Sequence, residues 1–254
     1  MTLAIDVDTS AGLVHGEAWG PGAEWALEQM PELLGSCDDW SGFEARHPIL
    51  VEARRRHPDI RLGRSGLVME SLVPTIIGQK VTTLEAQTSF RNLVRRFGEP
   101  APGPGGQVDL WVQPSPQALR SIASWDWLKL HVDGARSRPI VSSARVASSL
   151  ERVEGISLEE LDMRLRTVPG VGIWTSAEVR RRSFGDPDAV SFGDYHIAKT
   201  VGYALTGSPF DDDEMARLLE QWRPHRGRVV TLVMLSGIRV PRRGARMGPR
   251  THLP

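Results

Sequence analysis

A short glycine-containing segment, RTVPGVGIWTS at residues 166–176, has the composition of a backbone site for an anion. Pro169 ends the preceding helical segment, and Gly170 and Gly172 bracket a single valine. Glycines allow positive φ angles and let a ligand approach the backbone without a Cβ in the way. A helix expected to start near Ile173 points its free N–H groups into the turn. The segment predicts a helix-hairpin-helix that grips a phosphate, with a plain helix–helix connection as the alternative.

A carboxylate follows about 20 residues later, at Asp194 in the segment DAVSFGDYHI (residues 188–197). Asp194 opens the predicted helix DYHIAKTVGYAL, where aspartate is a common N-cap. A carboxylate at a helix N-terminus stays ionised. From the residues alone, a structural N-cap is the preferred interpretation of Asp194.

The elements around these two segments are predicted to be helical, apart from one β-hairpin. Residues 2–7 and 13–18 alternate and flank the turn DTSAG, which is typical of two antiparallel strands. Residues 65–79 are strongly apolar and predict a buried helix. A first helix from about Ala23 is expected to break near Pro31. The sequence therefore predicts a mainly α fold.

Two capping boxes mark helix starts in this pattern. Thr82 with Glu85 and Ser157 with Glu160 have the spacing at which two side chains and two backbone N–H groups pair reciprocally. Gly98 is a natural stop for the first of these helices.

Composition excludes several classes of protein. Cys37 is the only cysteine among the 254 residues, so the chain has no disulfide framework and no cysteine-held metal cluster. The N-terminus resembles no signal peptide, and no apolar run approaches membrane-spanning length. A soluble, cytoplasmic protein is expected. Residues 1–60 carry 11 acidic and 4 basic side chains, whereas the remainder is basic, which suits an anionic partner or a solvated acidic face.

The two segments together resemble the helix-hairpin-helix DNA glycosylases, and the 3-methyladenine DNA glycosylase II family in particular. LVPTIIGQKVT, SFRNLVRRFGEP and EQWRPHRGRVVTLVML are similar to other helices of that family. The resemblance implies two helical subdomains with a cleft between them, plus a short N-terminal β-hairpin. We expect the hairpin at residues 1–19, the glycosylase domain at 20–240 and a basic, mobile tail at 241–254.

The resemblance implies a monofunctional enzyme that flips and excises alkylated purines, such as 3-methyladenine and 7-methylguanine, in base excision repair. Asp194 falls on the family's catalytic aspartate, which implies that it stabilises the positive charge developing on the sugar and helps to activate or orient water. This role is compatible with that of an N-cap. The hairpin residues expected to hold a DNA phosphate are Gly170, Val171, Gly172 and Thr175. The expected partner is damaged double-stranded DNA, bound by a nucleoid-associated monomer.

Trp174 occupies the position at which related strand-cleaving glycosylases place a lysine that attacks the sugar. Lys199 lies about 140° round the helix from Asp194 and is a poor substitute. The sequence therefore predicts no lyase activity. Trp174 is expected either to stack on a flipped cationic base or to cover the hairpin as a core residue.

Further site residues are implied by position in the family. Gln79 and Tyr195 are candidates for the base pocket, or equally for structural polar roles. Leu128, Leu130 and Val132, in the loop 128–135, are candidates for a wedge that fills the gap left by the base. No metal or cofactor is expected, although the hairpin carbonyls suit a monovalent cation in the resembling family.

Two alternative functions stay open. One is a glycosylase of the same fold for a deaminated or oxidised base, since Ser191 and Phe192 give the Asp194 loop its own shape. The other is a helix-hairpin-helix protein that binds DNA without catalysis. Asp194 favours an enzyme, because a pure binder has no use for an acid facing phosphates. The family's β-rich N-terminal domain has only the residues 2–18 as a counterpart, which indicates a short or truncated form.

Overall fold

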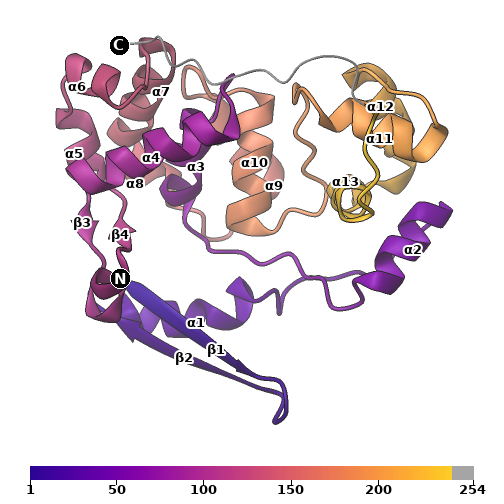
Figure 1. The fold of residues 1–254 in the computed structure, drawn as a ribbon, viewed down its shortest axis with the longest axis horizontal. Coiled ribbons are helices and arrows are strands. Elements are labelled where there is room, and N and C mark those ends of the chain that lie inside the picture. Colours follow the sequence, from indigo (N-terminus) through magenta and orange to yellow (C-terminus); the bar gives the residue numbers. More distant parts are fainter. Residues whose placement is uncertain (242–254) are drawn as a thin grey trace. The chain divides into compact units, whose positions relative to one another are not determined.

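The computed structural model describes residues 1–241 and divides them into two compact units (Figure 1). Within the described residues, unit 1 consists of residues 1–36 and 67–152, and unit 2 consists of residues 37–66 and 153–241. The predicted tail at 241–254 lies outside the described residues apart from Pro241.

Unit 1 begins with the predicted β-hairpin. Strands β1 (Thr2–Asp8) and β2 (Leu13–Trp19) are antiparallel, with Thr2 opposite Trp19 and Asp8 opposite Leu13. The hairpin packs on α1 (Ala23–Leu33), where Gly16 of β2 lies so close to Met30 that a Cβ would be 2.5 Å from its sulfur. The predicted break near Pro31 is wrong, because this proline lies inside the last turn of α1.

The core of unit 1 forms around α3 (Val68–Ile77), whose side chains are nearly all buried, as the apolar run predicts. Helix α3 packs against α4 (Thr83–Phe97), α7 (Gly134–Arg145) and α8 (Ala147–Leu150). It has no cap from its own N-cap residue. Instead, the Glu151 carboxylate accepts the N–H groups of Val68 at 2.9 Å and Met69 at 2.7 Å.

Smaller elements complete unit 1. They are β3 (Glu99–Pro100), the 3₁₀ helix η1 (Gly103–Val108), β4 (Trp111–Val112), α5 (Pro116–Ser121) and α6 (Ser124–Lys129). Strands β3 and β4 are antiparallel, with Glu99 opposite Val112 and Pro100 opposite Trp111. Gly98 ends α4 as predicted, and a Cβ there would lie 2.2 Å from the carbonyl oxygen of Val112, so the close approach of β4 requires glycine.

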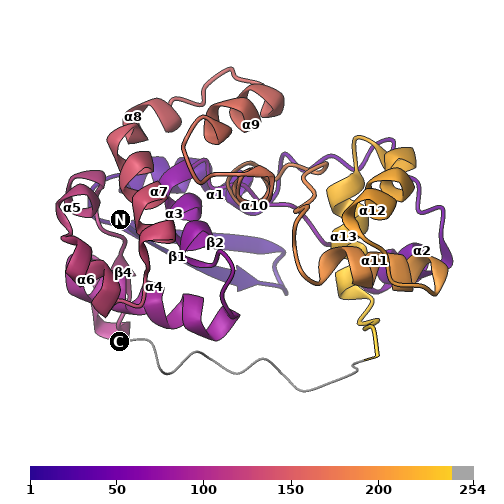
Figure 2. The ribbon, with the colours of Figure 1, turned by 90° about the horizontal axis from the view of Figure 1, so that it is seen from above.

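Unit 2 is helical in its described part and contains the predicted motif. Its helices are α2 (Pro48–Arg56), α9 (Leu158–Arg166), α10 (Ile173–Phe184), α11 (Ile197–Thr206), α12 (Asp212–Leu219) and α13 (Arg226–Leu235), with η2 (Glu220–Trp222) (Figures 1 and 2). Apolar side chains from α2, α11, α12 and α13 form one cluster, which Val190 joins from the loop before α11.

A buried ion pair ties the segment 37–66 to the rest of unit 2. The Arg228 guanidinium donates to both oxygens of Asp38, at 2.5 and 3.0 Å, and the two side chains are 2% and 1% exposed. Asp38 also accepts from the Leu62 N–H and the Trp40 indole. Because breaking such a pair leaves an uncompensated buried charge, the contact makes this segment part of the unit.

Helix starts follow two patterns. Both predicted capping boxes are present, Thr82 with Glu85 and Ser157 with Glu160. Helix α10 has no side-chain cap at all, because its N-cap residue is Gly172.

Candidate functional site

The predicted hairpin joins α9 to α10 through a tight turn. The N–H of Val171 donates to the carbonyl of Val168 at 3.0 Å, and Gly170 adopts a φ of 90°, which a side chain would disfavour. The N–H of Ser176 then donates to the Gly172 carbonyl, which closes the first turn of α10. Sequence and geometry agree on a helix-hairpin-helix.

The turn buries its apolar side chains and exposes its glycine backbone. Val168 and Val171 are buried, whereas Pro169, Gly170 and Gly172 are exposed. A Cβ built on Gly172 would have no atom within 4 Å, so the space in front of this backbone is open. Thr175, the fourth residue expected to contact phosphate, is 2% exposed, so it is not at the open surface of the turn.

The N-terminal end of α10 is electrostatically suited to an anion. No side chain caps it, and no acidic residue lies in its first turn. The start of α12 is the opposite case, because a capping box and three acidic residues occupy its first turn. The first turn of α10 therefore carries no carboxylate of its own that would offset the helix dipole; at the end of this turn, the Ser176 hydroxyl donates to Asp162 of α9 at 2.6 Å.

Asp194 lies in the same unit, in the loop that leads from α10 to α11. Its Oδ1 accepts the N–H groups of His196 at 2.8 Å and Ile197 at 3.1 Å. Its Oδ2 makes no hydrogen bond or ion pair with any residue of unit 2 that the structure describes. The half-buried carboxylate is thus held through one oxygen and presents the other.

The predicted helix start is displaced. Helix α11 begins at Ile197, three residues after Asp194, rather than at Asp194 itself. The physical reason is that the Asp194 carboxylate bonds the N–H groups two and three residues ahead in a turn before the helix, and Tyr195 and His196 remain outside it.

Two other acidic side chains near this loop pair with arginines. Asp188 accepts hydrogen bonds from the N–H and guanidinium of Arg226, including one at 2.6 Å, and pairs with Arg223 at 3.2 Å. Asp186 is buried against Arg180, and burial raises its pKa above the ordinary value even though that arginine opposes the shift. Neither carboxylate is open in the way that Asp194 is.

The aromatic candidates differ in accessibility. Trp174, on the first turn of α10, is half-buried. Tyr195 is 75% exposed, but the Lys199 ammonium lies 4.0 Å from the centre of its ring and the His196 ring packs against it edge-on at 4.8 Å. One face of Tyr195 is therefore already taken by a cation.

Gln79 and the three wedge candidates belong to unit 1. Gln79 follows α3, is half-buried, and its N–H donates to the Ile76 carbonyl. Leu130 is 2% exposed and Val132 is fully buried, so these two predicted wedge residues are core residues and cannot reach DNA without leaving the core. Leu128 lies in the last turn of α6 rather than in a loop, and at 53% exposure it is the candidate that reaches the surface.

The 128–135 loop is held rigidly by a residue that the sequence did not single out. Arg136 is buried, and its guanidinium donates to the carbonyl of Ile77 at 3.0 Å and to that of His131 at 2.8 Å. His131 is exposed and has a φ of 58°, an unusual value for a residue other than glycine. Arg136 therefore links the end of α3, next to Gln79, to the tip of this loop.

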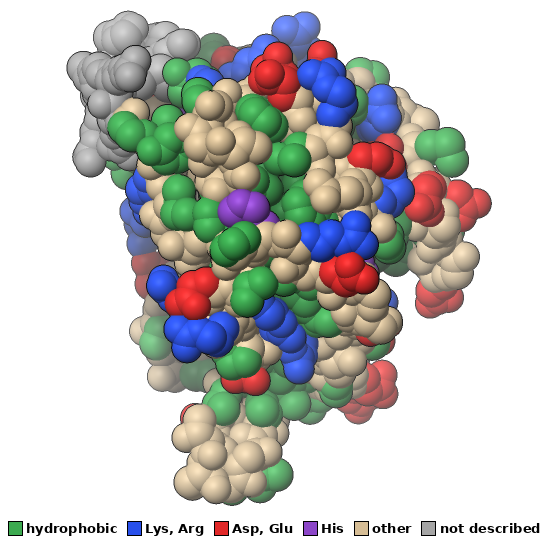
Figure 3. All heavy atoms as spheres, turned by 90° about the vertical axis from the view of Figure 1, so that its right-hand side faces the viewer, with side chains coloured by type: hydrophobic (Ala, Val, Ile, Leu, Met, Phe, Trp, Pro, Cys, Tyr) green, Lys and Arg blue, Asp and Glu red, His purple; other side chains and the backbone are tan. Residues whose placement is uncertain are grey.

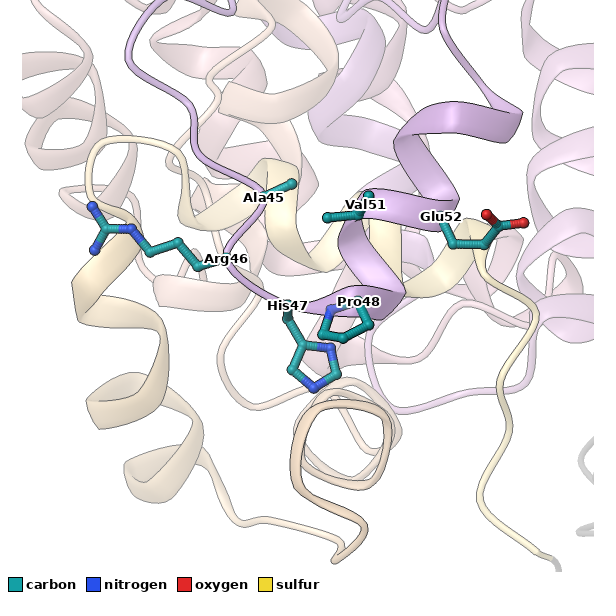
Figure 4. Close-up of a pocket in the computed structure, with 6 residues that line it drawn as sticks. All are labelled: Ala45, Arg46, His47, Pro48, Val51 and Glu52. Atoms are coloured by element: carbon teal, nitrogen blue, oxygen red, sulfur yellow. The ribbon is translucent and has the colours of Figure 1, made fainter.

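Two hollows lie in the surface of the described residues, and Leu130 is the one predicted site residue that lines either of them. A hollow of about 480 Å³ in unit 2 is lined by Ala45, Arg46, His47, Pro48, Val51 and Glu52, and Figure 4 shows Arg46 pointing away from the other side chains at the start of α2. A second hollow, of about 440 Å³ in unit 1, is lined by Asn92, Arg95, Arg96, Lys129 and Leu130. Arg96 and Lys129 share Asp126 as an ion-pair partner, so the second hollow is only weakly basic.

Surface charge is mixed on the face that carries the last helices. Figure 3 shows Lys and Arg side chains interspersed with Asp and Glu there, with no large area of one sign. Among residues 1–241, no cluster of His, Cys, Asp and Glu could hold a metal ion. In the same residues, no helix is both long and apolar enough to cross a membrane.

The chain has the fold of the helix-hairpin-helix DNA glycosylases. It matches the 3-methyladenine DNA glycosylase from Archaeoglobus fulgidus with a TM-score of 0.66, over 88% of this chain and 77% of that chain, at 19% identity. It matches an 8-oxoguanine glycosylase/lyase from Clostridium acetobutylicum with a TM-score of 0.68, over 91% and 88% of the two chains, at 16% identity.

Sequence comparison finds a relative with a higher identity. The chain is 30% identical over 217 residues to a Mycobacterium tuberculosis protein named as a probable bifunctional transcriptional activator/DNA repair enzyme AlkA. The match spans 79% of this chain but 42% of that relative, so the chain spans less than half the length of the curated relative. No protein-family model matches the chain. These comparisons confirm the predicted resemblance to the helix-hairpin-helix DNA glycosylases and to the 3-methyladenine DNA glycosylases among them.

Proposed function

We propose that this chain is a DNA glycosylase that removes alkylated purines, of the 3-methyladenine and 7-methylguanine type, from double-stranded DNA in base excision repair. The observation that carries the proposal is the presence in one unit of an open, uncapped hairpin backbone and of a carboxylate with one unpaired oxygen at Asp194. The names of the Mycobacterium and Archaeoglobus proteins support the same chemistry.

The hairpin is proposed to hold the DNA backbone. The exposed backbone at Gly172, the uncapped start of α10 and the dipole of this helix are proposed to attract a phosphate, and such a contact positions the duplex without reading its sequence. Val171 contributes by anchoring the turn in the core, because its side chain is buried. The hairpin carbonyls remain a proposed site for a monovalent cation.

Asp194 is proposed to act on the sugar after the base has left the stack. Breaking the N-glycosidic bond develops positive charge at the anomeric carbon, and the free Oδ2 can stabilise that charge and orient the attacking water. The two N–H groups on Oδ1 fix the direction of the carboxylate. An alkylated purine is already cationic and leaves readily, so this mechanism needs no strong general acid.

Trp174 and Tyr195 of unit 2 are proposed to line the base pocket, with Trp174 best suited to cover a cationic base through its ring face. For Tyr195 this role falls to the ring face that the Lys199 ammonium does not cover. Gln79, in unit 1, stays a prediction from its position in the resembling family. Leu128 is the residue of the predicted wedge that we propose to fill the gap in the duplex, because it is the exposed one.

We further propose that the enzyme does not cleave the strand. Trp174 stands where strand-cleaving relatives have a nucleophilic lysine, and the amine of Lys199, the only lysine of unit 2, lies over the Tyr195 ring. A second candidate substrate is an oxidised base, which the likeness to the Clostridium 8-oxoguanine glycosylase/lyase favours. The lysine-free hairpin argues against the lyase chemistry in that protein's name.

The test is single-turnover release of free base from alkylated duplex DNA by the wild type and by Asp194→Asn. The variant is expected to bind DNA but to lose about 100-fold or more in rate, because one preorganised electrostatic group typically supplies that much. Asp213→Asn is the matched control, since Asp213 is an exposed acid of α12 and no hydrogen bond involves its carboxylate among the described residues.

The outcomes separate the three functions. Release of 3-methyladenine or 7-methylguanine by wild type alone supports the proposal. Release of base only from a duplex that contains 8-oxoguanine would show that the chain is a glycosylase for an oxidised base instead of an alkylated one. DNA binding without release from any damaged duplex would identify a non-catalytic binder.

A further inference from the structure

A buried hydrogen bond joins the hairpin helix to the loop that carries Asp194. Glu178 lies in the middle of α10 and is buried, and its Oε1 accepts the hydroxyl of Ser191 at 2.6 Å. Ser191 is also buried and lies three residues before Asp194. The contact therefore bridges 13 residues of sequence, from the helix that starts at the hairpin to the loop that ends at the carboxylate.

The charge on Glu178 makes this a strong bond. Its Oε2 accepts from Arg181 at 3.1 Å and from Arg182 at 2.9 Å. Burial raises the pKa of Glu178, but Arg181, Ser191 and Arg182 together outweigh that effect and hold it below its ordinary value. Glu178 is therefore an anionic acceptor, and a hydroxyl donating to a carboxylate makes a short, charge-assisted hydrogen bond.

The backbone of the loop connects Ser191 to Asp194. The carbonyl of Ser191 accepts the N–H of Asp194 at 3.2 Å. Between them, Phe192 packs against the core of unit 2, and the N–H of Gly193 donates to Asp212 of α12 at 2.8 Å. Gly193 has a φ of 89°, so the loop turns sharply here and depends on the anchors on either side.

The position of the Asp194 carboxylate depends on this loop because no other side chain of unit 2 in the described residues holds it. Its only hydrogen bonds are to N–H groups two and three residues ahead, which move with the loop. A displacement of about 1 Å in a catalytic group is enough to lower a rate by about 100-fold.

We propose that Glu178 and Ser191 are positioning residues that fix the Asp194 loop to the hairpin helix, so that the carboxylate is held at a set place relative to the bound DNA backbone. This inference rests on the proposed function for its catalytic consequence. The contact itself is a property of unit 2 and can be tested separately.

The kinetic test compares wild type with Ser191→Ala in single-turnover base release and in binding to duplex DNA with an abasic-site analogue. The expected result is a fall of about tenfold in the release rate with unchanged DNA affinity, because the hairpin is intact and only the carboxylate is displaced. Glu178→Gln keeps an amide oxygen that can accept the Ser191 hydroxyl, so this variant is expected to retain most of the rate.

The matched control is Ser143→Ala in unit 1. Ser143 is fully buried, and its hydroxyl donates to the Pro139 carbonyl at 2.9 Å, so the same substitution here removes a buried serine hydrogen bond that is neutral, lies within α7 and is far along the chain from the Asp194 loop. The control is expected to lower stability without lowering the release rate of the folded protein. An equal fall in rate for Ser143→Ala and Ser191→Ala would reduce the role of Ser191 to stability alone and overturn the proposal.

A second readout does not depend on catalysis. Hydrogen exchange of the His196 and Ile197 amides, which donate to Asp194, is expected to accelerate in Ser191→Ala while the amides of α13 keep their protection. Unchanged exchange at these two amides would overturn the positioning role. If wild type releases no base from any duplex, the proposed function fails, and the exchange result still decides whether Ser191 holds the loop.

Discussion

Two aspartates of unit 2 show what separates a structural carboxylate from a candidate catalytic one. Asp38 is buried, and its two oxygens accept from the Arg228 guanidinium, the Leu62 N–H and the Trp40 indole. Asp194 is half-buried, has no cationic partner in the described part of its unit, and uses one oxygen. The saturated carboxylate holds a segment in place, whereas the unsaturated one is free to stabilise charge that arrives with a substrate.

The largest expected effect is a difference in stability between variants of these two residues. Asp38→Asn is expected to lower the free energy of unfolding by about 3–5 kcal/mol, because it leaves the buried Arg228 without its counter-charge. Asp194→Asn is expected to change it by less than about 0.5 kcal/mol, since asparagine still accepts the two N–H groups. Urea denaturation measures both. A stability loss at Asp194 as large as that at Asp38 would make Asp194 a structural residue.

The contrast between buried and open side chains extends to the loop 128–135 of unit 1. Leu130→Ala is expected to lower the free energy of unfolding by about 2–5 kcal/mol, because it creates a cavity in the core. Leu128→Ala is expected to stay within about 0.5 kcal/mol in stability, as an exposed site does, and to weaken base release. Denaturant midpoints and single-turnover rates test the pair. A stable Leu130→Ala protein with impaired base release would restore Leu130 as a wedge.

The two hairpin glycines give a smaller, paired prediction. Gly170→Ala is expected to cost about 1–2 kcal/mol of stability, because its φ of 90° is unfavourable for an L-residue. Gly172→Ala places its methyl group in open space, so stability is expected to hold while affinity for duplex DNA falls. Thermal unfolding and fluorescence anisotropy separate the effects. Unchanged DNA affinity in both variants would favour a plain connection between two helices.

The smallest expected effect concerns a carboxylate that is paired but exposed. Hydrogen bonds from Arg55 and Arg56 lower the pKa of Glu52 to about 2. Because the folded-state pKa is depressed, this contribution to stability is complete above the ordinary pKa of glutamate and is lost as the pH falls towards 2. An NMR titration of Glu52 measures the shift. Glu52→Gln is expected to change the free energy of unfolding only slightly, since exposed ion pairs contribute little. A loss of stability as large as that of Asp38→Asn would show that pairing of a carboxylate matters more than its burial.

Local features were predictable from sequence because their partners lie a few residues apart. The capping boxes at Thr82 and Ser157, the β-hairpin and the turn at Gly170 all depend on contacts within one or two turns of chain. Asp194 was predicted differently: its residue type and position near a helix start indicated an N-cap, and only the resemblance to the glycosylase family singled it out for catalysis. The helix itself starts later than predicted, because propensity does not show how far a side-chain turn extends before the first helical residue.

Other features follow from the tertiary structure alone. The bonds between Glu178 and Ser191 and between Asp38 and Arg228 join residues 13 and 190 positions apart, and no spacing rule covers them. Position in the resembling family suggested Leu128, Leu130 and Val132 as wedge residues, but packing decided that Leu130 and Val132 face the core. The sequence by itself determined which groups are chemically able to bind a phosphate and to stabilise a sugar cation. Burial and long-range hydrogen bonding decided which of them stay open to a ligand, because solvent exposure depends on the three-dimensional surroundings of a side chain and not on its type.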